Sequence, residues 1–145
     1  MKHWTDHQLA FVIARITIGI NFLLHGVVRL PKMEGFASGL SKGFEGTMLP
    51  PALVEPIAFG LPIVELVLGI LLIIGFKTRL AAALSFVLIT LLMAGTSFKE
   101  DWDLVGSQMI YVIFFFIFIK NLRHNTFAID GTSKTVVDGF SNQQQ

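Results

Sequence analysis

Four apolar segments, each long enough to cross a lipid bilayer, dominate this sequence of 145 residues. They cover approximately residues 9–30, 55–75, 80–97 and 103–120. At a rise of about 1.5 Å per residue, helices of these lengths match a hydrocarbon core of about 30 Å. Hydrophobic residues make up 53% of the chain and charged residues 14%, whereas an average soluble domain has roughly 25% charged residues. The sequence therefore predicts an all-α integral membrane protein, a four-helix bundle formed by residues 1–127.

The connections between these segments are short, except for the first one. Short turns at about 76–79 and 98–103 make consecutive helices antiparallel neighbours. The first connection, residues 31–54, carries apolar residues at intervals of three and four. This pattern predicts a short helix with one apolar face in the membrane interface. Residues 128–145 are polar, and we expect them to form a flexible tail.

Basic residues at the ends of the apolar segments and outside them indicate an orientation. Six lie on the side of the N-terminus, the second connection and the tail, and four lie on the opposite side. Cytoplasmic connections carry an excess of Lys and Arg, so we expect both termini in the cytoplasm. The six are Lys2, Lys77, Arg79, Lys120, Arg123 and Lys134, and the four are Arg29, Lys32, Lys42 and Lys99.

The first apolar segment carries a stripe of polar side chains on one helical face. Asn21, His25 and Arg29 follow each other at intervals of four residues, so they advance by only about 40° per step around a helix. Arg15 borders this stripe. A charged side chain in hydrocarbon costs at least about 2.5 kcal/mol. The stripe must therefore face protein, water or a bound polar molecule, and it is the candidate site.

Glu65 is the single ionisable residue of the second segment and lies near the middle of the membrane. A carboxylate at this depth must pair with a cation or take up a proton. Because the first two helices are antiparallel, we predict that Arg15 and Glu65 form an ion pair between them. This pair is either a structural clamp or a direct participant in the handling of protons or substrate, and the sequence leaves both readings open.

A site between the first, second and fourth helices is expected to include Gln108 and Tyr111, which enter the membrane from the same side as His25. The imidazole of His25 can take up or release a proton near neutral pH. Arg29, with Lys32 just beyond it, offers hydrogen-bond donors to an oxyanion. The alternative is that His25 only bonds a neighbouring helix and that Arg29 and Lys32 reach towards lipid headgroups.

The composition excludes several kinds of chemistry. The chain has no cysteine, so it cannot form a disulfide, a thiolate nucleophile or a cysteine-ligated metal centre. His25 is the one histidine inside an apolar segment, and we expect neither a haem nor a metal site. No basic aromatic patch suggests binding of nucleic acid. If the protein does redox chemistry, a bound organic cofactor or the substrates must carry the electrons.

Motifs in all of these regions follow one another in a fixed order. They comprise Arg15, Gly19, Phe22, Leu23, His25, Gly26, Arg29 and Leu30 in the first segment, Pro62, Glu65 and Gly69 in the second, and Gly75, Phe76, Lys77, Thr78 and Arg79 in the turn that follows. In this order they resemble the DoxX/DoxD family of small four-helix membrane proteins over residues 9–127. The resemblance is nearest to the DoxD-like small subunit of thiosulfate:quinone oxidoreductase.

The resemblance implies a bacterial inner-membrane oxidoreductase. Such an enzyme couples two thiosulfate ions into tetrathionate and passes two electrons to a membrane quinone, its electron acceptor. The catalytic residues that we expect are Arg15, His25 and Glu65, and the substrate-binding residues are Asn21, Arg29, Lys32, Gln108 and Tyr111. The sequence leaves open whether a second subunit or a homo-oligomer completes the enzyme.

Two other functions remain as alternatives. The first is a non-catalytic membrane subunit or scaffold that docks soluble redox partners. The second is a transporter of small solutes, which a single four-helix unit without internal repeats makes a poorer candidate.

Overall fold

The computed structural model of the protein describes residues 4–130, and within this range it is built from α-helices and two short 3-10 turns without any strand. The elements are α1 (Asp6–Arg29), η1 (Leu30–Lys32), α2 (Met33–Lys42), α3 (Pro51–Ile74), α4 (Thr78–Phe98), α5 (Trp102–Lys120) and η2 (Leu122–His124). Helices α1, α3, α4 and α5 are long and apolar enough to cross a membrane. The predicted all-α four-helix membrane fold is therefore confirmed.

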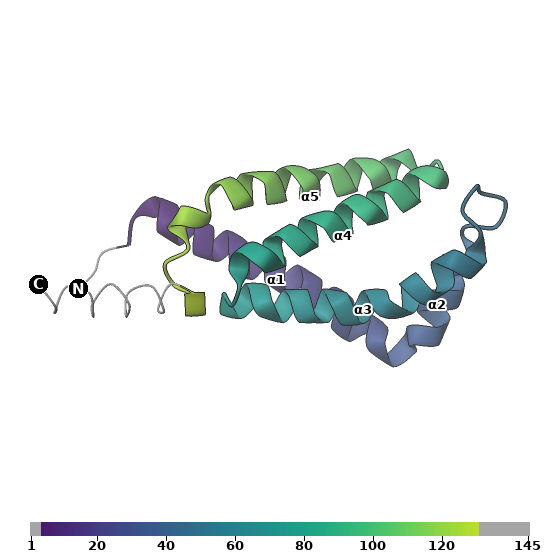
Figure 1. Cartoon of the computed structure of the whole chain (residues 1–145), viewed down its shortest axis with the longest axis horizontal. Coiled ribbons are helices and arrows are strands. Elements are labelled where there is room, and N and C mark those ends of the chain that lie inside the picture. Colours follow the sequence, from purple (N-terminus) through teal and green to yellow (C-terminus); the bar gives the residue numbers. More distant parts are fainter. Residues whose placement is uncertain (1–3, 131–145) are drawn as a thin grey trace, which may run out of the picture.

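The long helices form two antiparallel pairs (Figure 1). Helix α1 packs along α3, and α4 packs along α5. The start of α1 and the α3–α4 turn lie at one end of the bundle, which we call the terminal end. Helix α2 and the α4–α5 turn lie at the other end, the α2 end. Helix α2 follows α1 through η1 with a sharp change of direction and packs on α3, so the short helix expected in the first connection is present.

Capping residues determine where the long helices begin and end. Thr5 and Gln8 form a reciprocal capping box at the start of α1, with bonds of 3.3 and 3.1 Å. Asp101 caps α5 by accepting a hydrogen bond of 3.1 Å from the backbone N–H of Leu104. Gly75 ends α3 in the left-handed conformation, with a φ of 68°. Each long helix begins one to four residues before its predicted apolar segment, because polar or proline residues form its first turn.

Glycines let α1 and α3 approach each other closely. A Cβ added to Gly26 of α1 would lie 2.6 Å from the carbonyl oxygen of Pro62 in α3. A Cβ added to Gly69 of α3 would lie 2.8 Å from the Cα of Leu23 in α1, and Gly19 is similarly close to α3. Small residues allow this kind of helix packing inside membranes. These contacts fix the register of α1 against α3.

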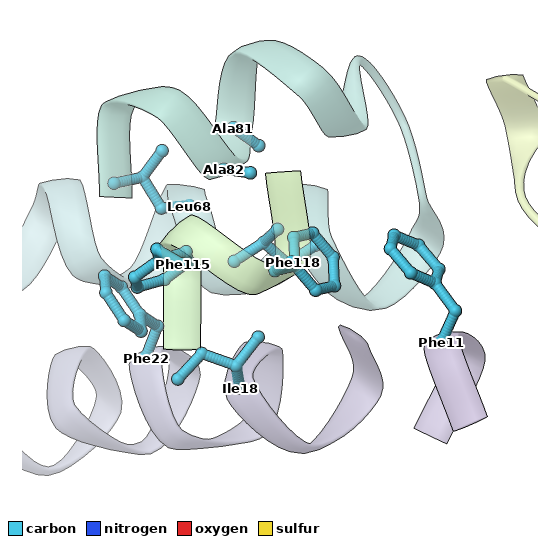
Figure 2. Close-up of a cluster of buried hydrophobic side chains, with 9 residues drawn as sticks. Phe11, Ile18, Phe22, Leu68, Ala81, Ala82, Phe115 and Phe118 are labelled. Atoms are coloured by element: carbon cyan, nitrogen blue, oxygen red, sulfur yellow. The ribbon is translucent and has the colours of Figure 1, made fainter. Parts of the chain in front are cut away.

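Aromatic side chains join α5 to the α1–α3 pair (Figure 2). Phe118 of α5 stacks on Phe11 of α1 with ring centroids 4.4 Å apart, and Phe115 of α5 meets Phe22 of α1 edge to face at 5.9 Å. Two alanines near the start of α4 complete this cluster from the other side (Figure 2). The buried cluster consists of Phe11, Ile18, Phe22, Leu68, Leu72, Ala81, Ala82, Phe115 and Phe118.

Candidate functional site

The buried carboxylate of Glu65 is the centre of a polar site in the α1–α3 interface. Its side chain is only 6% exposed. Oε2 accepts a hydrogen bond of 2.5 Å from Nη1 of Arg29, and Oε1 lies 3.6 Å from Nδ1 of His25. The structure therefore brings together His25, Arg29 and Glu65, three of the residues that the sequence predicts for one site. We call these three residues the acid cluster.

The local sequence explains this geometry. His25 and Arg29 are four residues apart in α1 and so share one face of the helix. Gly26 lies between them and allows α1 to touch the backbone of Pro62 in α3. Glu65 follows Pro62 by about one helical turn, on the same side of α3. The close approach of the two backbones therefore puts both basic side chains within reach of the carboxylate.

The members of the acid cluster differ in how much of each side chain is accessible. The side chain of Arg29 is 25% exposed, and Phe36 of α2 covers its guanidinium, with 4.7 Å between the guanidinium carbon and the ring centroid. Nε and Nη2 of Arg29 make no hydrogen bond to any of the residues 4–130. The side chain of His25 is 47% exposed, so its imidazole is the most accessible group of the cluster. Within residues 4–130, no group of three His, Asp or Glu side chains could hold a metal ion.

Arg15 has other partners, and the predicted ion pair between Arg15 and Glu65 is wrong. Arg15 is only 2% exposed. Its Nη1 donates a hydrogen bond of 3.0 Å to Oδ1 of Asn125, and its Nη2 donates one of 2.6 Å to the backbone carbonyl of Phe127. The guanidinium is therefore held by the segment that follows α5, at the terminal end of the bundle.

The register of the two helices explains why this prediction fails. The predicted ion pair requires the start of α1 and the end of α3 to lie at the same depth in the membrane. Instead α1 begins at Asp6 and runs past the end of α3, so Arg15 lies beside Gly75. His25 faces Glu65, and Arg15 precedes it by ten residues, which is about 15 Å along the helix axis. That separation is too long for an Arg–Glu contact.

A second polar cluster surrounds the α3–α4 turn at the terminal end. Asp130 accepts hydrogen bonds from the backbone N–H groups of Lys77 and Thr78, at 2.8 and 2.6 Å. Its own N–H donates to the carbonyl of Gly75 at 3.1 Å. Burial raises the pKa of Asp130, but these hydrogen bonds from Thr78 and Lys77, with the charge of Arg15, outweigh it and hold the pKa below its usual value. The carboxylate of Asp130 thus caps the N-terminus of α4 from a distant part of the chain.

Sequence reasoning missed these partners because it assigned the chain from residue 128 onward to a flexible tail. Ala128 and Asp130 pack on the α3–α4 turn, and the remainder of that tail, residues 131–145, lies outside the described residues. The sequence does contain one indication of this contact. Lys77, the residue directly before α4, has no side-chain acceptor for the first N–H groups of the helix. An acceptor for these groups must therefore come from elsewhere in the chain.

The other predicted site residues lie at three different places. Nδ2 of Asn21 lies 3.5 Å from the hydroxyl of Tyr111 and links α1 to α5 about one turn from His25. Nε2 of Gln108 donates a hydrogen bond of 3.2 Å to Oγ1 of Thr96 in α4, so its amide faces α4. Lys32 is exposed at the end of η1.

Comparison with known proteins agrees with this architecture. The model of the DoxX family matches residues 10–99, which include most of α1, all of α2 to α4 and the whole acid cluster. No curated protein and no solved structure matches the chain. The family match covers more than half of the sequence, and the matched part contains three of the four membrane-length helices. The protein is therefore an integral membrane protein of the DoxX family.

Proposed function

We propose that the protein is a membrane oxidoreductase that transfers electrons from thiosulfate, or a similar small sulfur oxyanion, to a membrane quinone. The observation that carries the proposal is the acid cluster, in which a carboxylate, an imidazole and a guanidinium meet inside an apolar bundle. The resemblance of the motifs to the DoxD-like small subunit of thiosulfate:quinone oxidoreductase supplies the reaction class.

The reaction defines what the protein has to provide. Two thiosulfate dianions each lose one electron and join through a new S–S bond, which gives tetrathionate. The quinone takes up these two electrons and two protons and becomes a quinol. Thiosulfate releases no proton in this step, so both protons come from water through the protein. The exposed imidazole of His25, 3.6 Å from the carboxylate of Glu65, is suited to relay them.

The acid cluster also has the charge that a dianion requires. The carboxylate of Glu65 balances Arg29, so protonation of His25 makes the cluster positive. The N–H groups at Nε and Nη2 of Arg29 are available to donate hydrogen bonds to an oxyanion, because only Nη1 bonds to Glu65. Lys32, exposed three residues further along the chain, adds a second cation. In a surrounding of low dielectric such charges attract an anion more strongly than they do in water.

A quinone-reduction assay tests the proposal. The purified full-length protein is mixed with thiosulfate and a soluble quinone analogue, and reduction of the quinone is followed by absorbance. We expect a thiosulfate-dependent rate that His25→Ala and Glu65→Gln both abolish. Glu55→Gln is the matched control, because Glu55 is an exposed carboxylate on the same helix. Circular dichroism confirms that each variant keeps its helical content.

The result that overturns the proposal is a rate equal to that of a mixture without protein. Absence of turnover together with a soluble redox protein that copurifies would support the alternative function, a docking subunit. Movement of labelled thiosulfate into liposomes without reduction of the quinone would identify a transporter.

A further inference from the structure

A wide, open pocket of about 950 Å³ lies at the terminal end, between the start of α4 and the end of α5. Three basic residues line it: Lys77, directly before α4, Arg79 in the first turn of α4, and Arg123 in η2. Apolar residues line it as well, among them Leu80 and Ile119. The pocket lies at the opposite end of the bundle from α2, and none of the acid cluster lines it.

Among residues 4–130, no ion pair balances the positive charge of this pocket. The ion pairs among residues 4–130 are those of Glu65 with His25 and Arg29, so Lys77, Arg79 and Arg123 form none. Asp130 is the one acidic residue of the lining, and its two oxygens already accept hydrogen bonds from the backbone of α4. The pocket therefore presents three cations against a single carboxylate that is already hydrogen-bonded.

The position of the pocket suggests the chemistry of its ligand. Helix α4 begins at Thr78 and α5 ends at Lys120, so the cations lie at the level where membrane-spanning helices meet the lipid headgroups. From this level Leu80 and Ala83 on α4 and Ile119 on α5 continue the lining towards the interior of the membrane. A ligand that matches both parts has a negative head and an apolar chain.

We propose that this pocket binds an anionic phospholipid. The phosphate lies among Arg79, Arg123 and Lys77, and the beginning of an acyl chain lies along Leu80, Ala83 and Ile119. Basic pockets between membrane helices at the bilayer surface bind acidic lipid headgroups for the same electrostatic reason. A free phosphate ion would use the cations and leave the apolar part of the pocket empty. This proposal is independent of the proposed redox function.

Native mass spectrometry of the full-length protein in detergent tests the proposal. The protein is offered equal amounts of phosphatidylglycerol, which is anionic, and phosphatidylcholine, which is zwitterionic. We expect preferential retention of phosphatidylglycerol by the wild type. Arg79→Gln/Arg123→Gln should weaken that retention on the order of tenfold or more. The matched control Lys42→Gln/Lys99→Gln removes the same charge at the α2 end and should retain the lipid like the wild type.

A third variant tests the apolar part of the pocket while all charges remain. Ala83→Trp fills the space beside Leu80 and Ile119 and should also reduce retention of phosphatidylglycerol. Equal retention of the two lipids by the wild type, or equal losses in the two double variants, would overturn the proposal. Displacement of phosphatidylglycerol by inorganic phosphate would overturn it in favour of a simple anion site. Variants that lose helical circular dichroism are replaced by the single changes Arg79→Gln and Arg123→Gln, with the same expected order of retention.

Discussion

Gly69 of α3 lies directly against the backbone of Leu23 in α1, and a Cβ at Gly69 would be 2.8 Å from the Cα of Leu23. Real Cβ atoms do not come this close to backbone atoms. Glu65 lies one turn earlier on the same helix and contacts residues just beyond Leu23. The geometry of the acid cluster therefore depends on a close contact between α1 and α3. This contact leaves no space for an additional methyl group on Gly69.

The first prediction concerns this contact. Gly69→Ala should push α1 and α3 apart and destabilise the fold by about 1–3 kcal/mol, as overpacking of a tight core does. Gly60→Ala is the matched control on the same helix, because a Cβ at Gly60 meets nothing within 4 Å. Thermal unfolding in detergent, followed by circular dichroism, measures both. Equal unfolding temperatures for the two variants would contradict the prediction.

The second prediction concerns the hydrogen-bonded ion pair between Arg29 and Glu65. Arg29→Gln leaves the buried carboxylate without its closest cation and should destabilise the fold by about 3 kcal/mol. The double variant Arg29→Gln/Glu65→Gln removes the stranded charge and should be more stable than Arg29→Gln alone. The unfolding free energies of the four proteins form a double-mutant cycle. Losses that simply add would show that the pair contributes no coupling.

A third prediction follows from the hydrogen bonds of Arg15. Arg15→Gln and Asn125→Ala both break the hydrogen bond between these two residues, and each also breaks one further bond, from Arg15 to the carbonyl of Phe127 or from Asn125 to Thr78. Each change should cost about 1–3 kcal/mol, and the double variant should lose less than the sum of the two single variants. Thr126→Ala is the control, because Thr126 is exposed and next to Asn125. Thermal unfolding of the two single variants, the double variant and the control checks this. A double variant as unstable as the sum of the singles would mean that the hydrogen bond between Arg15 and Asn125 contributes nothing to stability.

The pH dependence of stability should reveal the cap that Asp130 provides. Its pKa is lowered in the folded protein, so the charged form is favoured by folding. The stabilisation is complete above the usual pKa of an Asp, about 4, and is lost as the pH falls through the lowered pKa. The difference in unfolding temperature between the wild type and Asp130→Asn should therefore be constant above about pH 5 and shrink below about pH 4. A difference that grows on acidification would contradict this assignment.

Most of the fold was predictable because hydrophobic length is a local property of the sequence. The four membrane helices and the short helix after α1 follow from apolar runs and helical spacing. The inward face of the second half of α5 was not predictable, because the residues after Tyr111 are apolar on all sides of the helix and no polar side chain orients them. Phe115 is fully buried in the aromatic core and Phe116 is 56% exposed, a difference that arises from contacts with α1 and α4.

The candidate site was predictable only where its residues share a helix. His25 and Arg29 lie four residues apart, so one helical repeat places both on the same face. The partner of a residue on another helix depends on register, which the close glycine contacts of α1 and α3 determine. For this reason the sequence predicts that Glu65 lies beside the polar stripe but not which cation it meets, and Arg15, the predicted partner, lies about 15 Å too far along α1.

The contacts of Arg15 have a consequence for biosynthesis. They join α1 to acceptors 110 and 112 positions later in the chain. Translation delivers the N-terminal part of a chain first, so this arginine reaches the membrane when neither acceptor has yet left the ribosome. The hydrogen bonds that hold Arg15 in the folded protein can therefore form only after α5 and the residues behind it have been made.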